Sequence, residues 1–154
     1  MKRKIYLLFF IPLLIGCNNQ NSSYTGEKMK IEYAENGGFV TIDPEFLYNH
    51  AFIDRIDSIY LFGDSGCEAC LSLKNSMEAW AKYYHAKIYY LPISSITESN
   101  KHYVLDATEG YYVWQDQDIV PTTYFFMQGS VAFKANDSNT IKYLDRYVEV
   151  SNPN

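Results

Sequence analysis

Basic residues are scarce in this sequence. The 154 residues include 13 Lys and Arg against 18 Asp and Glu, and the formal net charge is -5 at pH 7. Three of the basic residues, Lys2, Arg3 and Lys4, stand at the very start, so the rest of the chain is more acidic still. Binding to nucleic acid depends on clustered Lys and Arg that neutralise phosphates. The sequence has no such cluster, and we expect no nucleic-acid partner.

Cysteine and histidine are scarce as well. There are three cysteines, of which only Cys67 and Cys70 stand close together. The three histidines are His50, His85 and His102. A structural zinc site takes four such ligands, often from two CxxC pairs. One CxxC pair with scattered histidines makes that site hard to assemble, so we expect neither a metal nor another cofactor.

Aromatic residues, in contrast, are abundant, with 15 Tyr and 9 Phe. The hydrophobic fraction is 47% and the aromatic fraction is 17%, both above what a disordered chain carries. A chain of this length ordinarily forms one domain around a single core.

The first 17 residues have the layout of a secretory signal. The basic start is followed by an apolar run from Ile5 to Ile15, which only Pro12 interrupts. This run is too short to span a bilayer comfortably as a permanent helix. We therefore expect residues 1–16 to be removed as a signal peptide.

The segment Leu14-Ile15-Gly16-Cys17 resembles the lipobox of bacterial lipoproteins, in which the cysteine becomes the new N-terminus and carries lipid on its sulfur. The resemblance implies a lipid anchor such as palmitate on Cys17, and a place in the cell envelope on the extracytoplasmic side of a bacterial membrane. An ordinary signal peptide with an incidental cysteine is the alternative.

Residues 18–28 have almost no apolar content, which predicts a flexible tether behind the anchor. We expect the lipidated N-terminus and the tether to cover residues 17–37, and the folded domain to cover residues 38–150.

Short apolar runs bounded by turn residues predict strands, at residues 39–42, 58–62, 87–93, 122–127 and 131–134. Helices are expected from Pro44 to about residue 53 behind an Asp43 N-cap, weakly over 97–107, and after a Ser138 N-cap. The last helix should present Ile141, Leu144 and Val148 on one side. Strands that alternate with helices and end in a hairpin predict an α/β fold.

A longer helix is expected to follow the CxxC pair. Its apolar residues recur at the spacing of one helix face, at Cys70, Leu73, Met77, Trp80, Ala81 and Tyr84. Two cysteines separated by one turn at a helix start can bond to each other, and the first is exposed to the positive end of the helix dipole. Cys67 would then attack a substrate disulfide and Cys70 would resolve the mixed disulfide. An inert structural disulfide is the alternative.

Two segments carry a family resemblance. The strand at 59–62, the loop at 63–66, the Cys67-Glu-Ala-Cys70 pair and its helix resemble the active-site half of thioredoxin-like proteins. Residues 119–126, Ile-Val-Pro-Thr-Thr-Tyr-Phe-Phe, are similar to the second signature of that family. The resemblance covers roughly residues 39–148 and implies a thioredoxin-like three-layer α/β/α fold with a central mixed sheet. It also implies that Pro121 is cis beside the cysteines and that Val120 presents its backbone to the substrate.

The chain departs from the family at three places. Gly66 stands where a Trp precedes the first cysteine, and Glu68 and Ala69 replace a Gly-Pro pair. Leu61 stands where thioredoxins keep a buried aspartate. A proton acceptor for the second cysteine is therefore missing or comes from elsewhere, with Asp64 and Glu68 as candidates. The negative charge of Glu68 should also oppose thiolate formation at the first cysteine.

These observations favour a membrane-anchored thiol-disulfide oxidoreductase, whose partners would be thiols or disulfides of exported proteins and a membrane redox protein. The chain is loosely similar to bacteriocin-associated thioredoxin-like accessory proteins. The alternative is a non-catalytic accessory lipoprotein with a structural disulfide, which binds a partner and serves secretion, conjugation, adhesion or envelope assembly. The aromatic segment at residues 111–114 either packs in the core or forms a lip for substrate docking.

Overall fold

The computed structural model describes residues 27–111, 120–136 and 139–151. The expected signal peptide, Cys17, residues 112–114 of the aromatic segment and Ser138 lie outside these described residues.

A five-stranded mixed sheet forms the centre of the domain. Its strands are β2 (Gly38–Thr41), β3 (Ser58–Gly63), β4 (Lys87–Pro92), β5 (Thr122–Met127) and β6 (Ser130–Ala135). The strand order is β2-β4-β3-β5-β6, with β2, β4 and β3 parallel and with β5 and β6 antiparallel to their neighbours. All six residues of β3 are buried, as the apolar run at this position predicts for a central strand.

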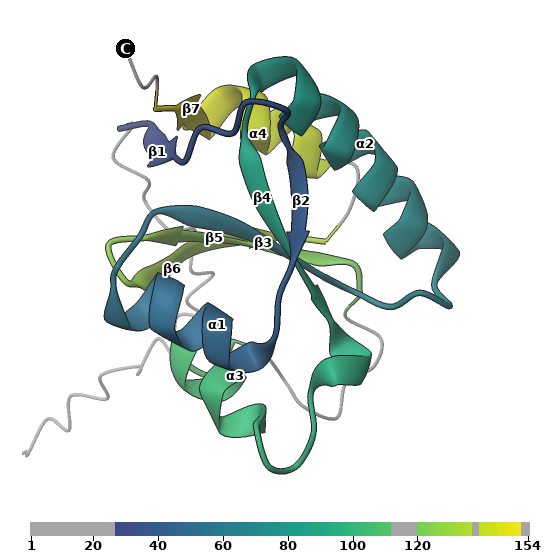
Figure 1. Cartoon of the computed structure of the whole chain (residues 1–154), viewed down its shortest axis with the longest axis vertical. Coiled ribbons are helices and arrows are strands. Elements are labelled where there is room, and N and C mark those ends of the chain that lie inside the picture. Colours follow the sequence, from purple (N-terminus) through teal and green to yellow (C-terminus); the bar gives the residue numbers. More distant parts are fainter. Residues whose placement is uncertain (1–26, 112–119, 137–138, 152–154) are drawn as a thin grey trace, which may run out of the picture.

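Helices cover both faces of this sheet (Figure 1). They are α1 (Pro44–Leu47), α2 (Glu68–Tyr84), α3 (Lys101–Ala107) and α4 (Asn139–Tyr147), with a π-helical turn η1 (Tyr48–Ile53) after α1 and a 3-10 turn η2 (Ile93–Ser95) after β4. The core is accordingly split in two. Alternate residues of β3 face α2 and α4 on one side, where Ile59 and Leu61 lie, and α1 and α3 on the other, where Tyr60 and Phe62 lie.

Local sequence signals explain where α1 begins and which face of α2 is buried. The Asp43 side chain accepts a hydrogen bond from the backbone N–H of Phe46 at 2.8 Å, which confirms the expected N-cap. The predicted apolar face of α2 is buried from Cys70 to Ala81. Tyr84 is an exception. It is 45% exposed because it is the last residue of the helix, where its ring packs on Trp80.

The structure differs from the expected tether at residues 29–31. These form β1 (Met29–Ile31), which pairs in parallel with β7 (Val148–Val150) beside α4 (Figure 1). Met29 and Ile31 are fully buried while Lys30 is exposed, the alternation of a half-buried strand. Val148, expected on the last helix, lies in β7 instead, because the chain becomes extended after Tyr147. The ordered domain thus includes residues 29–31, which lie before the expected domain boundary at residue 38.

Candidate active site

The two cysteines lie at the junction between β3 and α2. A short loop follows β3, and the Asp64 carboxylate accepts a hydrogen bond from the backbone N–H of Gly66 at 3.3 Å within it. Cys67 is the N-cap of α2 and is half-buried, whereas Cys70 is 2% exposed on the face of α2 that packs on the sheet. The two residues form a disulfide, with their Cα atoms 5.2 Å apart. The spacing inference from the sequence is therefore confirmed.

The helix end supplies positive potential to the first sulfur. The Cys67 Sγ atom accepts a hydrogen bond from the backbone N–H of Cys70 at 3.1 Å. This N–H is one of the amides at a helix start that has no partner within the helix. When the disulfide is opened, the same N–H and the dipole of the 17-residue helix would stabilise a thiolate at Cys67. Glu68 is exposed in the first turn, where water screens its opposing charge.

The second predicted segment lies against the first. The peptide bond between Val120 and Pro121 is cis, and the carbonyl oxygen of Val120 is 4.0 Å from the Cys67 sulfur. The sheet explains the approach, because β5 begins directly after Pro121 and pairs antiparallel with β3, with Thr122 opposite Phe62. Pro121 is buried and Val120 is half-buried. The structure thus brings together the two cysteines and the two expected substrate-binding residues, Val120 and Pro121. Cys67 and Val120 are 53 positions apart in the sequence.

The surroundings of Cys70 bear on its proton acceptor, which the sequence left either missing or supplied from elsewhere. Leu61 is fully buried and lies between Thr123 of β5 and Tyr90 of β4 in the strand register. Asp64 is half-buried and uses its carboxylate within the loop, and Glu68 is exposed, so neither of the two candidate acids is fully buried. Sequence reasoning missed Tyr90, because its place beside position 61 follows from the pairing of β3 with β4.

Solved structures with a similar chain trace include thioredoxins. Thioredoxin O1 from Arabidopsis thaliana in its oxidised state superposes with a TM-score of 0.51 at 21% identity, over 71% of this chain and 98% of the other. The N21Q mutant thioredoxin from Halobacterium salinarum superposes with a TM-score of 0.53 at 18% identity, over 77% of this chain and 98% of the other. The chain has a thioredoxin-like fold.

No family model matches the sequence, and no curated protein matches it. At these levels of identity, the likeness to thioredoxins establishes the fold of the chain alone.

Metal-binding groups and membrane-spanning helices were also sought among the described residues. Over residues 27–111, 120–136 and 139–151, no group of three or more His, Cys, Asp or Glu side chains could hold a metal ion. No helix in the described part of the chain is long and apolar enough to cross a membrane. Of the aromatic segment, Tyr111 is described and is 39% exposed.

Proposed function

We propose that this chain is an extracytoplasmic thiol-disulfide oxidoreductase that acts on exported proteins through Cys67 and Cys70. The observation that carries the proposal is the position of the pair. A half-exposed cysteine caps α2, a buried one lies a turn further on, and the cis peptide before Pro121 lies against the first sulfur. The leader and the Cys17 motif support the extracytoplasmic setting.

The chemistry follows from the difference between the two sulfurs. In the dithiol form, Cys67 is the accessible sulfur and the one that the helix N-terminus favours as a thiolate. Its thiolate attacks one sulfur of a substrate disulfide, and the other substrate sulfur leaves with the electron pair and takes a proton. Cys70 then attacks Cys67, which forms the internal disulfide and releases the second substrate thiol. The reverse sequence transfers a disulfide to a substrate dithiol.

The backbone beside Pro121 would hold the substrate during this exchange. The Val120 carbonyl is close to the reactive sulfur, and Val120 is half-buried, so its main chain borders solvent at the site. A peptide in extended conformation can pair with such a main-chain edge, and side-chain identity then matters little. Exported proteins with different sequences around their cysteines would fit this type of site.

One observation favours a second candidate, a binding module with a structural disulfide. Leu61 stands where thioredoxins have a carboxylate next to the buried cysteine. Without that carboxylate, the Cys67–Cys70 bond would serve as a structural disulfide that is never reduced. The reduction potential separates the two functions. We expect the pair in the purified protein to equilibrate with glutathione buffers at a potential between about -270 and about -120 mV. A pair that stays oxidised well below about -300 mV would contradict the proposed activity and support a binding module with a structural disulfide.

A further inference from the structure

The side chain of Cys70 has a neighbour that none of the sequence signatures contains. A β-carbon added to Gly63, the last residue of β3, would lie 3.3 Å from the Cβ of Cys70. The same point is 3.2 Å from a ring carbon of Tyr90 and 3.5 Å from its hydroxyl oxygen. Cys70 and the phenol of Tyr90 therefore border one small space, which stays open because residue 63 has no side chain.

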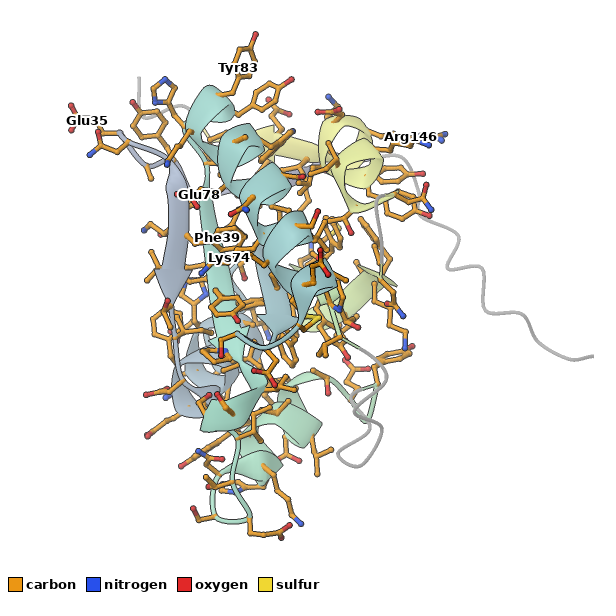
Figure 2. All side chains as sticks on the ribbon, turned by 90° about the vertical axis from the view of Figure 1, so that its right-hand side faces the viewer. Glu35, Phe39, Lys74, Glu78, Tyr83 and Arg146 are labelled. Atoms are coloured by element: carbon orange, nitrogen blue, oxygen red, sulfur yellow. A yellow bond between two sulfur atoms is a disulfide. The ribbon has the colours of Figure 1, made fainter. Side chains whose placement is uncertain are left out.

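The phenol is held in this place from two sides. The Nζ atom of Lys74 lies 4.2 Å from the centre of the Tyr90 ring, a cation–π contact. Lys74 is one helical turn after Cys70 on α2, so both side chains are on the same part of the helix. Phe39 of β2 meets the Tyr90 ring edge-on, with centroids 6.3 Å apart, and Figure 2 shows its side chain next to that of Lys74. Tyr90 itself is 9% exposed.

The titratable groups in this part of the domain lie on α2, on β4 and in the loop after β3. Asp64 lies in the loop after β3, Glu68 and Lys74 lie on α2, and Tyr90 lies on β4. Burial and, to a smaller degree, the negative charge of Asp64 raise the pKa of Tyr90. The phenol therefore keeps its proton at physiological pH and remains a hydrogen-bond donor. Leu61 stands in place of an acid, the phenol of Tyr90 borders the side chain of Cys70, and the ammonium group of Lys74 lies over the Tyr90 ring.

We propose that Tyr90 donates a hydrogen bond to the sulfur of Cys70 whenever that sulfur carries negative charge, and that Lys74 positions the phenol and adds a positive charge. This inference rests on the proposed function, because it concerns the resolving step of the same exchange. Tyr90 would thereby replace the carboxylate of thioredoxins with a group of opposite effect, since a carboxylate raises the pKa of a nearby thiol and a donor lowers it. In this chain the assistance is electrostatic and the proton of Cys70 passes to water.

The step can be written in full. The Cys70 thiol loses its proton to solvent, and its thiolate attacks Cys67 in the mixed disulfide. The Cys67–Cys70 bond forms while the bond from Cys67 to the substrate sulfur breaks, and the substrate sulfur leaves with the electron pair and takes a proton from solvent. The two cysteines are oxidised and the substrate disulfide is reduced. In the reverse direction Cys70 departs as a thiolate, so the hydroxyl of Tyr90 faces the same negative charge.

Tyr90→Phe tests the inference because it removes the hydroxyl and keeps the ring. The readout is the pH dependence of Cys70 alkylation by iodoacetamide in the full chain carrying Cys67→Ser, which requires no substrate. We expect Tyr90→Phe to raise the midpoint of this titration by about one pH unit, as expected for a lost hydrogen bond to a charged group. Lys74→Met should raise it by less, and its effect should nearly vanish once the hydroxyl is gone.

The matched control is Tyr83→Phe, which removes the hydroxyl of a residue that is 78% exposed at the other end of α2 (Figure 2). This variant should leave the titration unchanged. An unchanged midpoint in both Tyr90→Phe and Lys74→Met, with native circular dichroism, would overturn the inference. So would an equal shift in Tyr83→Phe. If Tyr90→Phe alone fails to fold, the result for Lys74→Met decides.

A second measurement separates this inference from the proposed function. Wild-type protein that never exchanges disulfides but shows the shift in Tyr90→Phe would refute the oxidoreductase and keep the role of Tyr90. Wild-type protein that exchanges disulfides, together with an unshifted Cys70 titration in Tyr90→Phe, would support the oxidoreductase and refute the role of Tyr90. Where both hold, release of a model peptide from its mixed disulfide with Cys67 should be several-fold slower in Tyr90→Phe. The slowing is less than the change in thiolate fraction, because a more basic thiolate is a better nucleophile.

Discussion

The Nδ1 atom of His50 lies 2.7 Å from the hydroxyl of Tyr60, on the face of the sheet that packs against α1 and α3. The other ring nitrogen is 3.2 Å from the hydroxyl of Tyr89, which itself donates a hydrogen bond to the Glu32 carboxylate. Because the proton of Tyr89 is used on Glu32, the Nε2 atom of His50 has to be the donor to Tyr89. The Nδ1 atom then accepts a hydrogen bond from Tyr60, and a neutral imidazole gives each of these four side chains a hydrogen-bond partner.

Protonation of His50 would break this arrangement, since both ring nitrogens would then be donors. Burial lowers the pKa of His50, and the negative charge of Glu32 opposes this only in part. For Glu32, burial raises the pKa, but hydrogen bonds from Tyr89 and Lys87 outweigh it and hold the pKa below 4.5. Both groups thus bind protons more weakly in the folded chain than in the unfolded chain.

The first prediction concerns acid stability. A group whose pKa is lowered by folding contributes stability that is complete above its unfolded pKa and is lost as the pH falls through its folded pKa. The free energy of unfolding should therefore decrease below about pH 6.5 through His50, and decrease again near about pH 4.5 and below through Glu32. His50→Gln should remove the first decrease and cost about 1–3 kcal/mol at pH 7, because buried hydroxyls lose a partner.

Urea unfolding monitored by circular dichroism between pH 4 and 8 measures this dependence. His102→Gln is the matched control, because His102 is exposed on α3. If His50→Gln and His102→Gln both keep the slope of the wild type near pH 6, the network does not govern acid stability.

The second prediction concerns the two cysteines as chemical partners. Cys70→Ala leaves Cys67 able to attack a substrate disulfide but removes the sulfur that resolves the mixed disulfide. Cells that express Cys70→Ala should accumulate exported proteins linked to Cys67, visible as bands on non-reducing gels that dithiothreitol removes. Cys67→Ala should give at least about tenfold less, because Cys70 is 2% exposed. Equal amounts of adducts in both variants would mean that the two sulfurs do not have separate roles.

The sequence predicted the site better than it predicted its surroundings. Cys67, Cys70 and Pro121 belong to local sequence patterns, which can be recognised without knowledge of the fold. Tyr90 does not, because its approach to Cys70 depends on the register between β3 and β4 and on the missing side chain of Gly63. The strand β1 was missed for a related reason. It has three residues, and its partner β7 follows almost the whole length of the domain later.

The hydrogen-bonded network of His50 shows the same limit from another direction. Its members come from the chain before β2, from β3, from β4 and from η1. Residues 48–53 follow the π-helical pattern, in which the backbone N–H of Asp54 reaches the carbonyl of Asn49 at 2.8 Å. Apolar periodicity predicts that a helix runs here, but it does not predict the extra residue per turn that sets the direction of His50.

The third prediction tests whether β1 belongs to the folded domain. Met29 is fully buried in the same core as α2 and α4, whereas its neighbour Lys30 is exposed. Met29→Ala should lower the free energy of unfolding by about 2–5 kcal/mol, the usual cost of truncating a buried methionine. Lys30→Ala should change it by less than about 0.5 kcal/mol. Two small and similar changes would show that residues 29–31 contribute little to stability and belong to the tether, as the expected boundary at residue 38 has it.

The last prediction concerns the anchor. If Cys17 carries lipid, Cys17→Ser removes the only sulfur at the expected cleavage site and no thioether can form there. The variant should move from the membrane fraction to the soluble fraction, and labelling with a palmitate analogue should disappear. Cys67→Ser serves as the control, because it also removes one cysteine but should keep both the label and the membrane fraction. If Cys17→Ser stays membrane-bound and labelled, the lipid is attached elsewhere. If the wild type carries no label, the leader is an ordinary signal peptide, and an oxidoreductase of this kind would work free of the membrane.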